Sequence, residues 1–270
     1  MKRARVESAV FLGGGRITGA LVAGLQRAGY NKPIVVHDRH ADKLRQLKRE
    51  YGVKVEANLQ RAVEQARLLI IAVRPDSVGE LLREIGKINR PLTAVSLAAG
   101  VPLAKLRAWL GPPVRWARAM PSPVCRSGQG LAAVTFERGL SRSAKRDVKD
   151  LFARVGPVLE IPETKFDAFT VTYSCSHGFH ALAALASEAE KLGLDRKTAL
   201  TAAAHALADG ILAWREGNIP LHRLLHEAST PGGIAAKVMS SMSKAGYERA
   251  VERGLRAGMA RARKNAKRFA

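Results

Sequence analysis

The sequence predicts an α/β domain with a doubly wound, mainly parallel sheet, followed by an all-helical domain. In residues 1–162, short apolar runs alternate with amphipathic helical patterns, which is typical of parallel strands covered on both faces. After Pro162 no convincing strand remains, and alanine-rich helical periodicity takes over. The chain of 270 residues is long enough for two domains. We therefore expect a first domain at 1–162 and a second at 163–270.

The elements of the first domain follow from its apolar runs. Strands are predicted at 8–12, 34–37, 53–55, 68–73, 92–98 and 114–120. Between them, apolar residues recur at helical spacing, as in Leu44/Leu47, Leu81/Leu82/Ile85 and Leu103/Leu106/Leu110. Two further strands, at 131–136 and 157–161, flank a predicted helix at 143–155 and extend the same sheet.

The second domain is predicted from two long helical patterns. One contains Leu182, Leu185, Ala189 and Leu192, and the other runs over 199–214. Gly193 is a stop signal for the first helix, and Asp195 is an N-cap for the second. Helices with wide apolar faces often pair with a second copy of themselves. We therefore expect a homodimer formed through this domain.

The most informative motif is the glycine turn Gly13-Gly14-Gly15, which joins the first strand to a helix. Glycine allows the sharp turn, and its bare backbone lets a pyrophosphate approach the free amides of the new helix. Thr18 takes the third position of the usual G-x-G-x-x-G pattern, and Gly19 follows it. The turn predicts a Rossmann-type dinucleotide site at Gly13, Gly15, Arg16 and Ile17. The alternative is a glycine-rich turn that binds no ligand.

The end of the second strand bears on cofactor choice. Asp38 follows this strand, where a carboxylate usually accepts hydrogen bonds from the ribose 2′-hydroxyl of NAD. Arg39 and His40 come next, and their charge suits the 2′-phosphate of NADP. Two basic groups against one acid favour NADP, with NAD as the alternative.

Five short blocks occur in order along nearly the whole chain, after the glycine turn. They are Val73-Arg74-Pro75, Ser96-Leu97-Ala98-Ala99-Gly100-Val101, Arg118-Ala119-Met120-Pro121, Gly193-Leu194-Asp195-Arg196 and Ser229-Thr230-Pro231-Gly232-Gly233. Together they resemble the pyrroline-5-carboxylate reductase family. This resemblance implies a Rossmann domain, a helical dimerisation domain, and reduction of a cyclic imine by a nicotinamide cofactor.

Three of these blocks extend the predicted cofactor site. The nicotinamide must lie at the carboxyl ends of parallel strands, where these blocks stand. We expect cofactor contacts from Val73, Arg74, Pro75, Ala98, Met120 and Pro121, together with Asp38 and Arg39. The alternative is that the prolines there only terminate strands.

The predicted substrate site departs from the family pattern. The family's Met-Pro-Asn-Thr-Pro becomes Met120-Pro121-Ser122-Pro123-Val124, and its Pro-Gly-Gly-Thr-Thr becomes Pro231-Gly232-Gly233-Ile234-Ala235. The resemblance implies that the lost threonines hold the substrate in relatives. The remaining candidates for substrate binding are Ser122, Ser176, Gly232 and Gly233, the last two through backbone amides at a helix start.

Two histidines stand where the family has Ser-Gly-Ser-Gly-Pro-Ala-Tyr. His177 and His180 lie three residues apart at a predicted helix start, so they can share one side of the helix. His177 could donate a proton as hydride arrives, with Tyr173 and Thr230 as the other catalytic candidates. The alternative is two solvated or packed polar side chains. A metal site is not expected, because the pair lacks a third close ligand.

Composition limits the partners and the compartment. No apolar run is long enough to span a bilayer, and the basic N-terminus lacks the unbroken apolar core of a signal peptide, so a cytoplasmic protein is expected. Cys125 and Cys175 are expected to be free thiols. The net charge of +22 suits either a solvated surface or a polyanion partner. We favour the solvated surface, so nucleic acid is not an expected partner.

Three functions fit these observations. The first is a reductase of a cyclic imine, either pyrroline-5-carboxylate or a related C=N compound. The second is a carbonyl reductase on the same scaffold, with histidine as the acid. The third is a dimer without catalytic activity that binds a dinucleotide or a polyanion, which the charge and the altered loop would favour.

Overall fold

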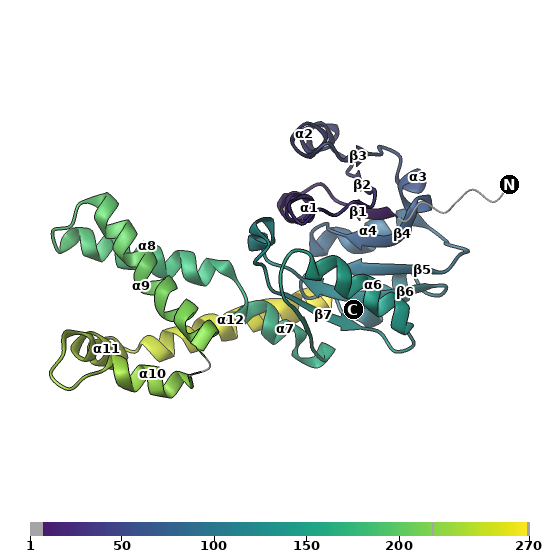
Figure 1. Cartoon of the computed structure of the whole chain (residues 1–270). Helices are drawn as coiled ribbons and strands as arrows, with labels where there is room; N and C mark the ends of the chain where they lie inside the picture. Colours follow the sequence, from purple (N-terminus) through teal and green to yellow (C-terminus); the bar gives the residue numbers. More distant parts are fainter. Residues whose placement is uncertain (1–7, 218, 269–270) are drawn as a thin grey trace. The chain divides into compact units, whose positions relative to one another are not determined.

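The computed structural model describes residues 8–217 and 219–268, apart from the side chains of Cys175 and Arg268. The chain divides into two compact units (Figure 1). Unit 1 contains residues 1–173 and 258–270, and unit 2 contains residues 174–257. Unit 2 is therefore an insertion into unit 1, because the chain returns to the first unit within its last helix.

Unit 1 contains one eight-stranded sheet in the order β3-β2-β1-β4-β5-β6-β7-β8. The strands are β1 (Ser8–Leu12), β2 (Ile34–His37), β3 (Lys54–Val55), β4 (Ala66–Ile71), β5 (Leu92–Ser96), β6 (Val114–Met120), β7 (Ala132–Phe136) and β8 (Val158–Glu160). The first six are parallel, β7 is antiparallel to β6, and β8 is parallel to β7. The predicted doubly wound, mainly parallel sheet is confirmed.

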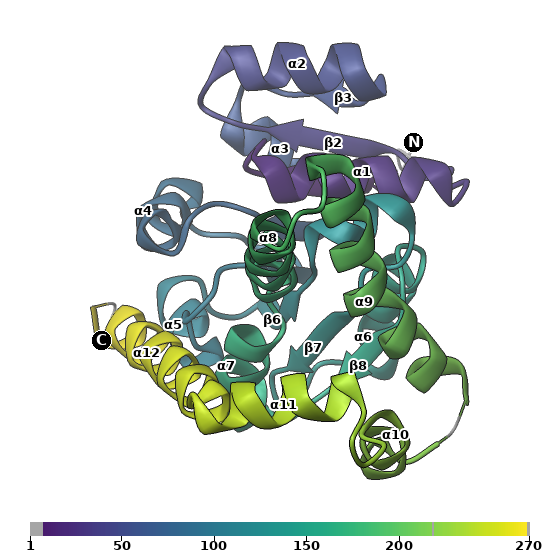
Figure 2. The same ribbon diagram turned by 90° about the vertical axis from the view of Figure 1, so that its left-hand side faces the viewer.

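Helices cover both faces of this sheet (Figure 2). One face packs on α1 (Arg16–Arg27), α2 (Ala41–Tyr51) and α6 (Arg142–Ala153), and the other on α3 (Leu59–Glu64), α4 (Pro75–Ile85) and α5 (Leu103–Trp109). The alternation of β1 decides this arrangement, since Ala9 and Phe11 enter the first core and Val10 and Leu12 the second. The short helix η1 (Pro123–Ser127) links β6 to β7.

Two strands end earlier than predicted. β4 ends at Ile71 and β5 at Ser96, two residues before the predicted ends. Val73 and Ala98 consequently lie in the connections that follow these strands. After β4 the chain leaves the sheet and begins α4 at Pro75. After β5 it leaves the sheet and turns at Gly100, whose φ is +71°.

A buried arginine holds α7 (Glu163–Thr172), the last helix before unit 2, within unit 1. Arg118 on β6 is 2% exposed and forms ion pairs with Glu163 at 3.2 Å and Asp167 at 3.1 Å on α7. Its guanidinium also lies over the ring of Phe166, 4.4 Å from the centroid. Glu163 additionally accepts a hydrogen bond from the Leu103 amide at the start of α5. These contacts hold α7 within unit 1.

Unit 2 is entirely helical in its described residues. It contains α8 (Cys175–Lys191), α9 (Arg196–Gly217), α10 (Leu221–Ala228), α11 (Ile234–Lys244) and the first half of α12 (Tyr247–Arg268). The predicted signals are confirmed: Asp195 Oδ1 accepts hydrogen bonds from the amides of Lys197 and Thr198, and Gly193 follows α8 with φ +102°.

Unit 2 has almost no interior of its own. Its buried apolar residues, among those described, are three alanines: Ala186, Ala199 and Ala203. By contrast, apart from Val124 and Leu159, all the exposed large apolar side chains of the described chain belong to this unit.

Candidate active site

The glycine turn lies between the carboxyl end of β1 and the start of α1. Gly13 has φ +112°, and a Cβ there would lie 2.6 Å from the carbonyl oxygen of Ala72. Its amide donates to the carbonyl of His37 at 2.7 Å, and its carbonyl accepts from Thr18 Oγ1 at 2.5 Å. Position 13 therefore requires glycine for the fold itself.

Gly15 differs from Gly13 in what surrounds it. It is the N-cap of α1, makes no side-chain cap bond, and a Cβ built on it meets no protein atom within 4 Å. Arg16 beside it is exposed, and Ile17 packs against the first core. The turn thus leaves open space beside Gly15 at the start of α1, and a helix start stabilises an anion through its free N–H groups and the helix dipole. These residues fit a dinucleotide pyrophosphate.

Asp38 closes the adjacent side of the turn. Its Oδ2 accepts from the Gly14 amide at 2.7 Å, and its Oδ1 accepts from the His40 amide and lies 2.8 Å from His40 Nδ1. Burial by itself raises the pKa of this carboxyl, but the hydrogen bonds from Gly14 and His40 and the charge of Lys43, 3.5 Å away, outweigh burial and lower it. Arg39 is exposed next to this group.

The other predicted cofactor residues follow strands of the same parallel set. Val73, Arg74 and Pro75 follow β4, Ala98 follows β5, Met120 ends β6, and Pro121 comes after it. Because β1, β2, β4, β5 and β6 are parallel, their carboxyl ends meet at one edge of the sheet. The structure therefore brings these positions to the same edge as Gly13, Gly15 and Asp38.

Two further candidates of unit 1 have local structural contacts. Ser122 is 5% exposed, and its Oγ accepts from the Val124 amide at 3.3 Å, so the hydroxyl caps η1. Tyr173 follows α7; its ring lies 5.2 Å from that of Phe169, and its amide donates to the Phe169 carbonyl. Neither contact was expected from the sequence.

The candidates of unit 2 lie at two helix starts. Ser176, His177 and His180 are in the first turns of α8 and are exposed; Ser176 Oγ lies 2.6 Å from Ser174 Oγ. Thr230 is exposed in the turn before α11, and its carbonyl accepts from the Gly233 amide at 2.9 Å. That amide is therefore engaged, so an anion at this turn would have to use the Gly232 amide or the first amides of α11.

The sequence predictions did not include the contacts of two charged residues, Lys43 with Asp38 and Arg118 with α7. Lys43 lies on α2, and only the fold brings its ammonium beside Asp38. Arg118 had a usable signal, because a charged residue inside an apolar strand must find partners when it is buried.

The described residues bear on two further chemistries, a reactive thiol and a bound metal ion. Cys125 is a buried free cysteine, and burial raises the pKa of its thiol to about 11, so it is a poor nucleophile at neutral pH. The side chain of Cys175 lies outside the described residues. Within the described part of the chain, no group of three His, Cys, Asp or Glu side chains is placed to hold a metal ion, and no helix has the length and apolarity to cross a membrane.

Comparison with known proteins gives the family. The pyrroline-5-carboxylate reductase of Corynebacterium melassecola is 30% identical over 255 residues, which cover 91% of this chain and 94% of the relative. The chain belongs to the pyrroline-5-carboxylate reductase family. Another member of this family, from Mycobacterium tuberculosis (strain CDC 1551 / Oshkosh), is 28% identical over 279 residues, covering 93% of this chain and 94% of the relative.

Family models and solved structures agree with this membership. A model described as "NADP oxidoreductase coenzyme F420-dependent" matches residues 8–100, and one described as "Pyrroline-5-carboxylate reductase dimerisation" matches residues 163–265. The reductase structure from Coxiella burnetii has a TM-score of 0.86 at 23% identity, covering 97% of this chain and 99% of that one. The Plasmodium falciparum enzyme, solved with NADP bound, also has a TM-score of 0.86 at 20% identity, with the same coverage. The pyrroline-5-carboxylate reductase fold therefore extends over both units of the chain.

Proposed function

We propose that this protein is an NAD(P)H-dependent reductase that transfers hydride to the C=N bond of a cyclic imine, either pyrroline-5-carboxylate or a related compound. The observation that carries the proposal is the open cradle at Gly15, at the edge where the parallel strands end, in a chain of this family. We expect it to act in the cytoplasm.

The cofactor would be held by residues at that edge. Gly13 and Gly15 with Arg16 and Ile17 would hold the pyrophosphate, and the residues after β4, β5 and β6 (Val73, Arg74, Pro75, Ala98, Met120 and Pro121) would contact the ribose and the nicotinamide. When bound, the nicotinamide supplies the hydride.

We propose a preference for NADPH, with NADH as the alternative. Asp38 carries the negative charge that ordinarily disfavours a 2′-phosphate. His40 and Lys43 are already close to that carboxylate, and the exposed Arg39 stands beside it. His40 and Lys43 offset the carboxylate and leave Arg39 to pair with a phosphate.

The imine nitrogen needs a proton as the hydride arrives. His177 is the first candidate for this donor, because imidazole exchanges a proton near neutral pH and its side chain is exposed on the first turn of α8. Tyr173 and Thr230 are the other candidates. We assign Ser122, Ser176, Gly232 and Gly233 to substrate binding, with Ser122 and Gly233 acting only if they exchange their present hydrogen bonds.

We propose that the working assembly is a homodimer built through unit 2. Helices that bury only alanines in the single chain cannot supply the apolar burial that stabilises a domain of this size. The matching dimerisation model covers these helices, and a second copy offers the same apolar surface. We propose that the dimerisation domain begins near Pro162, although α7 packs within unit 1.

The charge distribution is the observation behind one alternative function, the binding of a polyanion. Residues 174–257 contain ten basic and eight acidic residues, so they account for +2 of the net charge of +22, and the remaining +20 belongs to unit 1. A polyanion-binding dimer without catalytic activity would explain this imbalance, as would a solvated basic surface.

Steady-state oxidation of NADPH with a panel of cyclic imines and keto acids distinguishes these functions. Turnover of imines alone supports the proposal, and turnover of keto acids alone supports a carbonyl reductase. No turnover of any compound, together with salt-sensitive binding of nucleic acid, would contradict the proposal in favour of the polyanion-binding dimer.

A further inference from the structure

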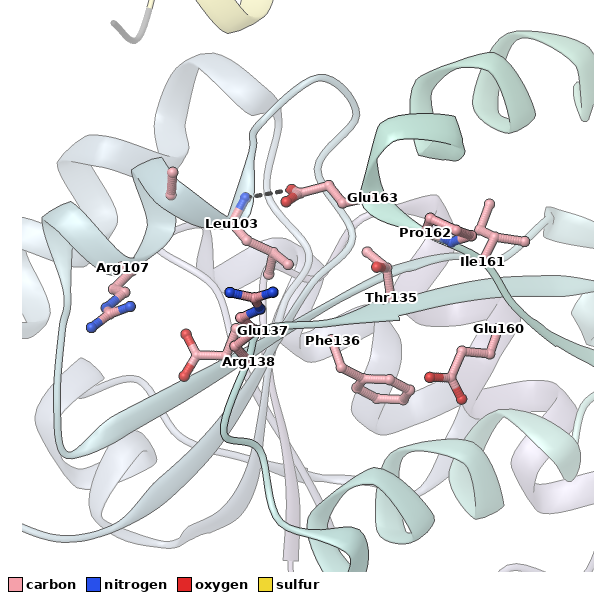
Figure 3. Close-up of a pocket in the computed structure, with 11 residues that line it drawn as sticks. Leu103, Arg107, Thr135, Phe136, Glu137, Arg138, Glu160, Ile161, Pro162 and Glu163 are labelled. Atoms are coloured by element: carbon pink, nitrogen blue, oxygen red, sulfur yellow. Dashed lines mark hydrogen bonds between the residues drawn. The ribbon is translucent and has the colours of Figure 1, made fainter.

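A cavity of about 510 Å³ lies in unit 1, lined by residues of α5, the end of β7 and the segment from β8 into α7 (Figure 3). None of the predicted cofactor residues lines it. In the β6–β7 pairing, Met120 lies opposite Ala133 and Ala117 lies opposite Phe136, so the end of β7 points away from the cofactor edge. The cavity is therefore separate from the candidate active site.

The cavity combines a polar floor with charged and apolar walls. Thr135 lies on β7 and Glu137 follows directly after this strand, and they are 4% and 8% exposed. Arg107 and Arg138 supply positive charge, and neither forms an ion pair with another of the described residues. Figure 3 shows Arg107, Glu137 and Arg138 grouped on one side and Phe136 on the other, with Ile161 and Pro162 beyond Thr135.

Two buried polar atoms without hydrogen-bond partners occur beside this cavity. In the described part of the chain, such side-chain atoms are Glu137 Oε2 and Arg118 Nε. Glu137 lines the cavity, and its other oxygen, Oε1, is occupied by Arg115 at 3.2 Å. Arg118 lies opposite Thr135 in the sheet and pairs with Glu163, and both of these residues line the cavity. A buried acceptor such as Glu137 Oε2 is costly to leave unpaired unless a further group satisfies it.

We propose that this cavity binds a small zwitterion of the apolar α-amino acid class. Arg107 and Arg138 bind its carboxylate, because a guanidinium matches a carboxylate in geometry and charge. Glu137 Oε2 accepts from its ammonium group. Phe136 and Leu103 contact its apolar side chain. The inference does not rest on the proposed imine reduction, since neither the cofactor edge nor unit 2 takes part.

Calorimetry with the full-length protein tests the charge pattern. The probes are L-leucine and two analogues that each lack one of its charged groups, 4-methylpentanoate and 3-methylbutylamine. We expect L-leucine to bind and each analogue to bind about tenfold more weakly or worse, because each loses one charge-assisted interaction. Absence of binding by L-leucine and by the other apolar L-amino acids, or equal binding of the three probes, would overturn the proposal.

Substitutions locate the binding within the cavity. Glu137→Gln keeps the size of the side chain and Arg107→Gln changes an exposed residue, and both should weaken L-leucine binding by about tenfold. Lys105→Gln, on the same helix but outside the lining, is the control and should bind like the wild type. NADPH affinity should be unchanged in all three, and thermal unfolding checks that each is folded. Binding that survives Arg107→Gln and Glu137→Gln in folded protein, or a crystal grown with L-leucine that shows an ordered water alone on Glu137, would refute this site.

Discussion

Replacement of Gly15 by leucine should greatly weaken cofactor binding while leaving the protein folded. A Cβ at this position meets no protein atom within 4 Å, so the new side chain occupies open space. That space adjoins the start of α1, whose first amides we assign to the pyrophosphate. Loss of two charge-assisted hydrogen bonds, each of about 1.5–3 kcal/mol, would weaken NADPH binding by about a hundredfold or more.

The cost of Gly15→Leu to folding should be small by comparison. Exchange of an N-cap glycine for an apolar residue typically costs about 1 kcal/mol or less. Gly13→Ala is the informative contrast, because its methyl group would lie 2.6 Å from the Ala72 carbonyl oxygen and φ is +112°. Gly13→Ala should therefore lower the melting temperature much more than Gly15→Leu does. Calorimetry that returns wild-type NADPH affinity for Gly15→Leu would refute the placement of the pyrophosphate.

Four further predictions address the cofactor, the assembly and the substrate. Arg39→Ala should raise the KM for NADPH by about tenfold and hardly change that for NADH; equal effects on the two would count against a phosphate contact. Because the pKa of Asp38 is lowered in the folded protein, its carboxylate stabilises the fold above the unfolded-state pKa and loses this contribution as pH falls through the folded-state pKa. The difference in melting temperature between wild type and Asp38→Asn should therefore become smaller when the proteins are melted at acid pH. A difference that does not change with pH would contradict this role of Asp38. Light scattering should show a dimer that Trp214→Glu dissociates and the equally exposed control Leu159→Glu leaves intact, whereas a wild-type particle of 29.1 kDa would exclude the dimer. Turnover of pyrroline-5-carboxylate should be weak, with kcat/KM reduced by about a hundredfold or more by the missing hydroxyl donors, and a value in the ordinary enzyme range of about 10⁴–10⁸ M⁻¹s⁻¹ would refute substrate drift.

The sheet could be predicted from the sequence because its signals are local. Apolar runs placed all eight strands within a few residues, and the glycine turn identified where β1 ends. The direction of β7 could not be predicted, because a long connection through η1 permits either orientation and the choice depends on contacts distant in sequence. The same limit applies to Arg118, whose partners Glu163 and Asp167 lie more than forty residues away.

The candidate site was predictable where it depends on strand ends alone. Parallel strands bring their carboxyl ends to one edge, so motif positions after β1, β2, β4, β5 and β6 had to meet there. Individual hydrogen bonds were not predictable. The sequence suggested Ser122 for substrate and the Gly233 amide for an anion, and each already has a partner nearby in the chain. Such pairings depend on backbone angles that residue type alone does not determine.

The alanine interior of unit 2 has a consequence for how selection acts on this protein. If these helices are completed only by a second copy, dilution acts on them as a denaturant does, and the apparent stability depends on protein concentration. A substitution on their apolar surface would then reduce the amount of protein in the cell, because unpaired chains are degraded, before it changed any rate constant. Residues far from every reacting atom would accordingly be as constrained as those that touch the substrate, and low expression would be the first sign of their loss.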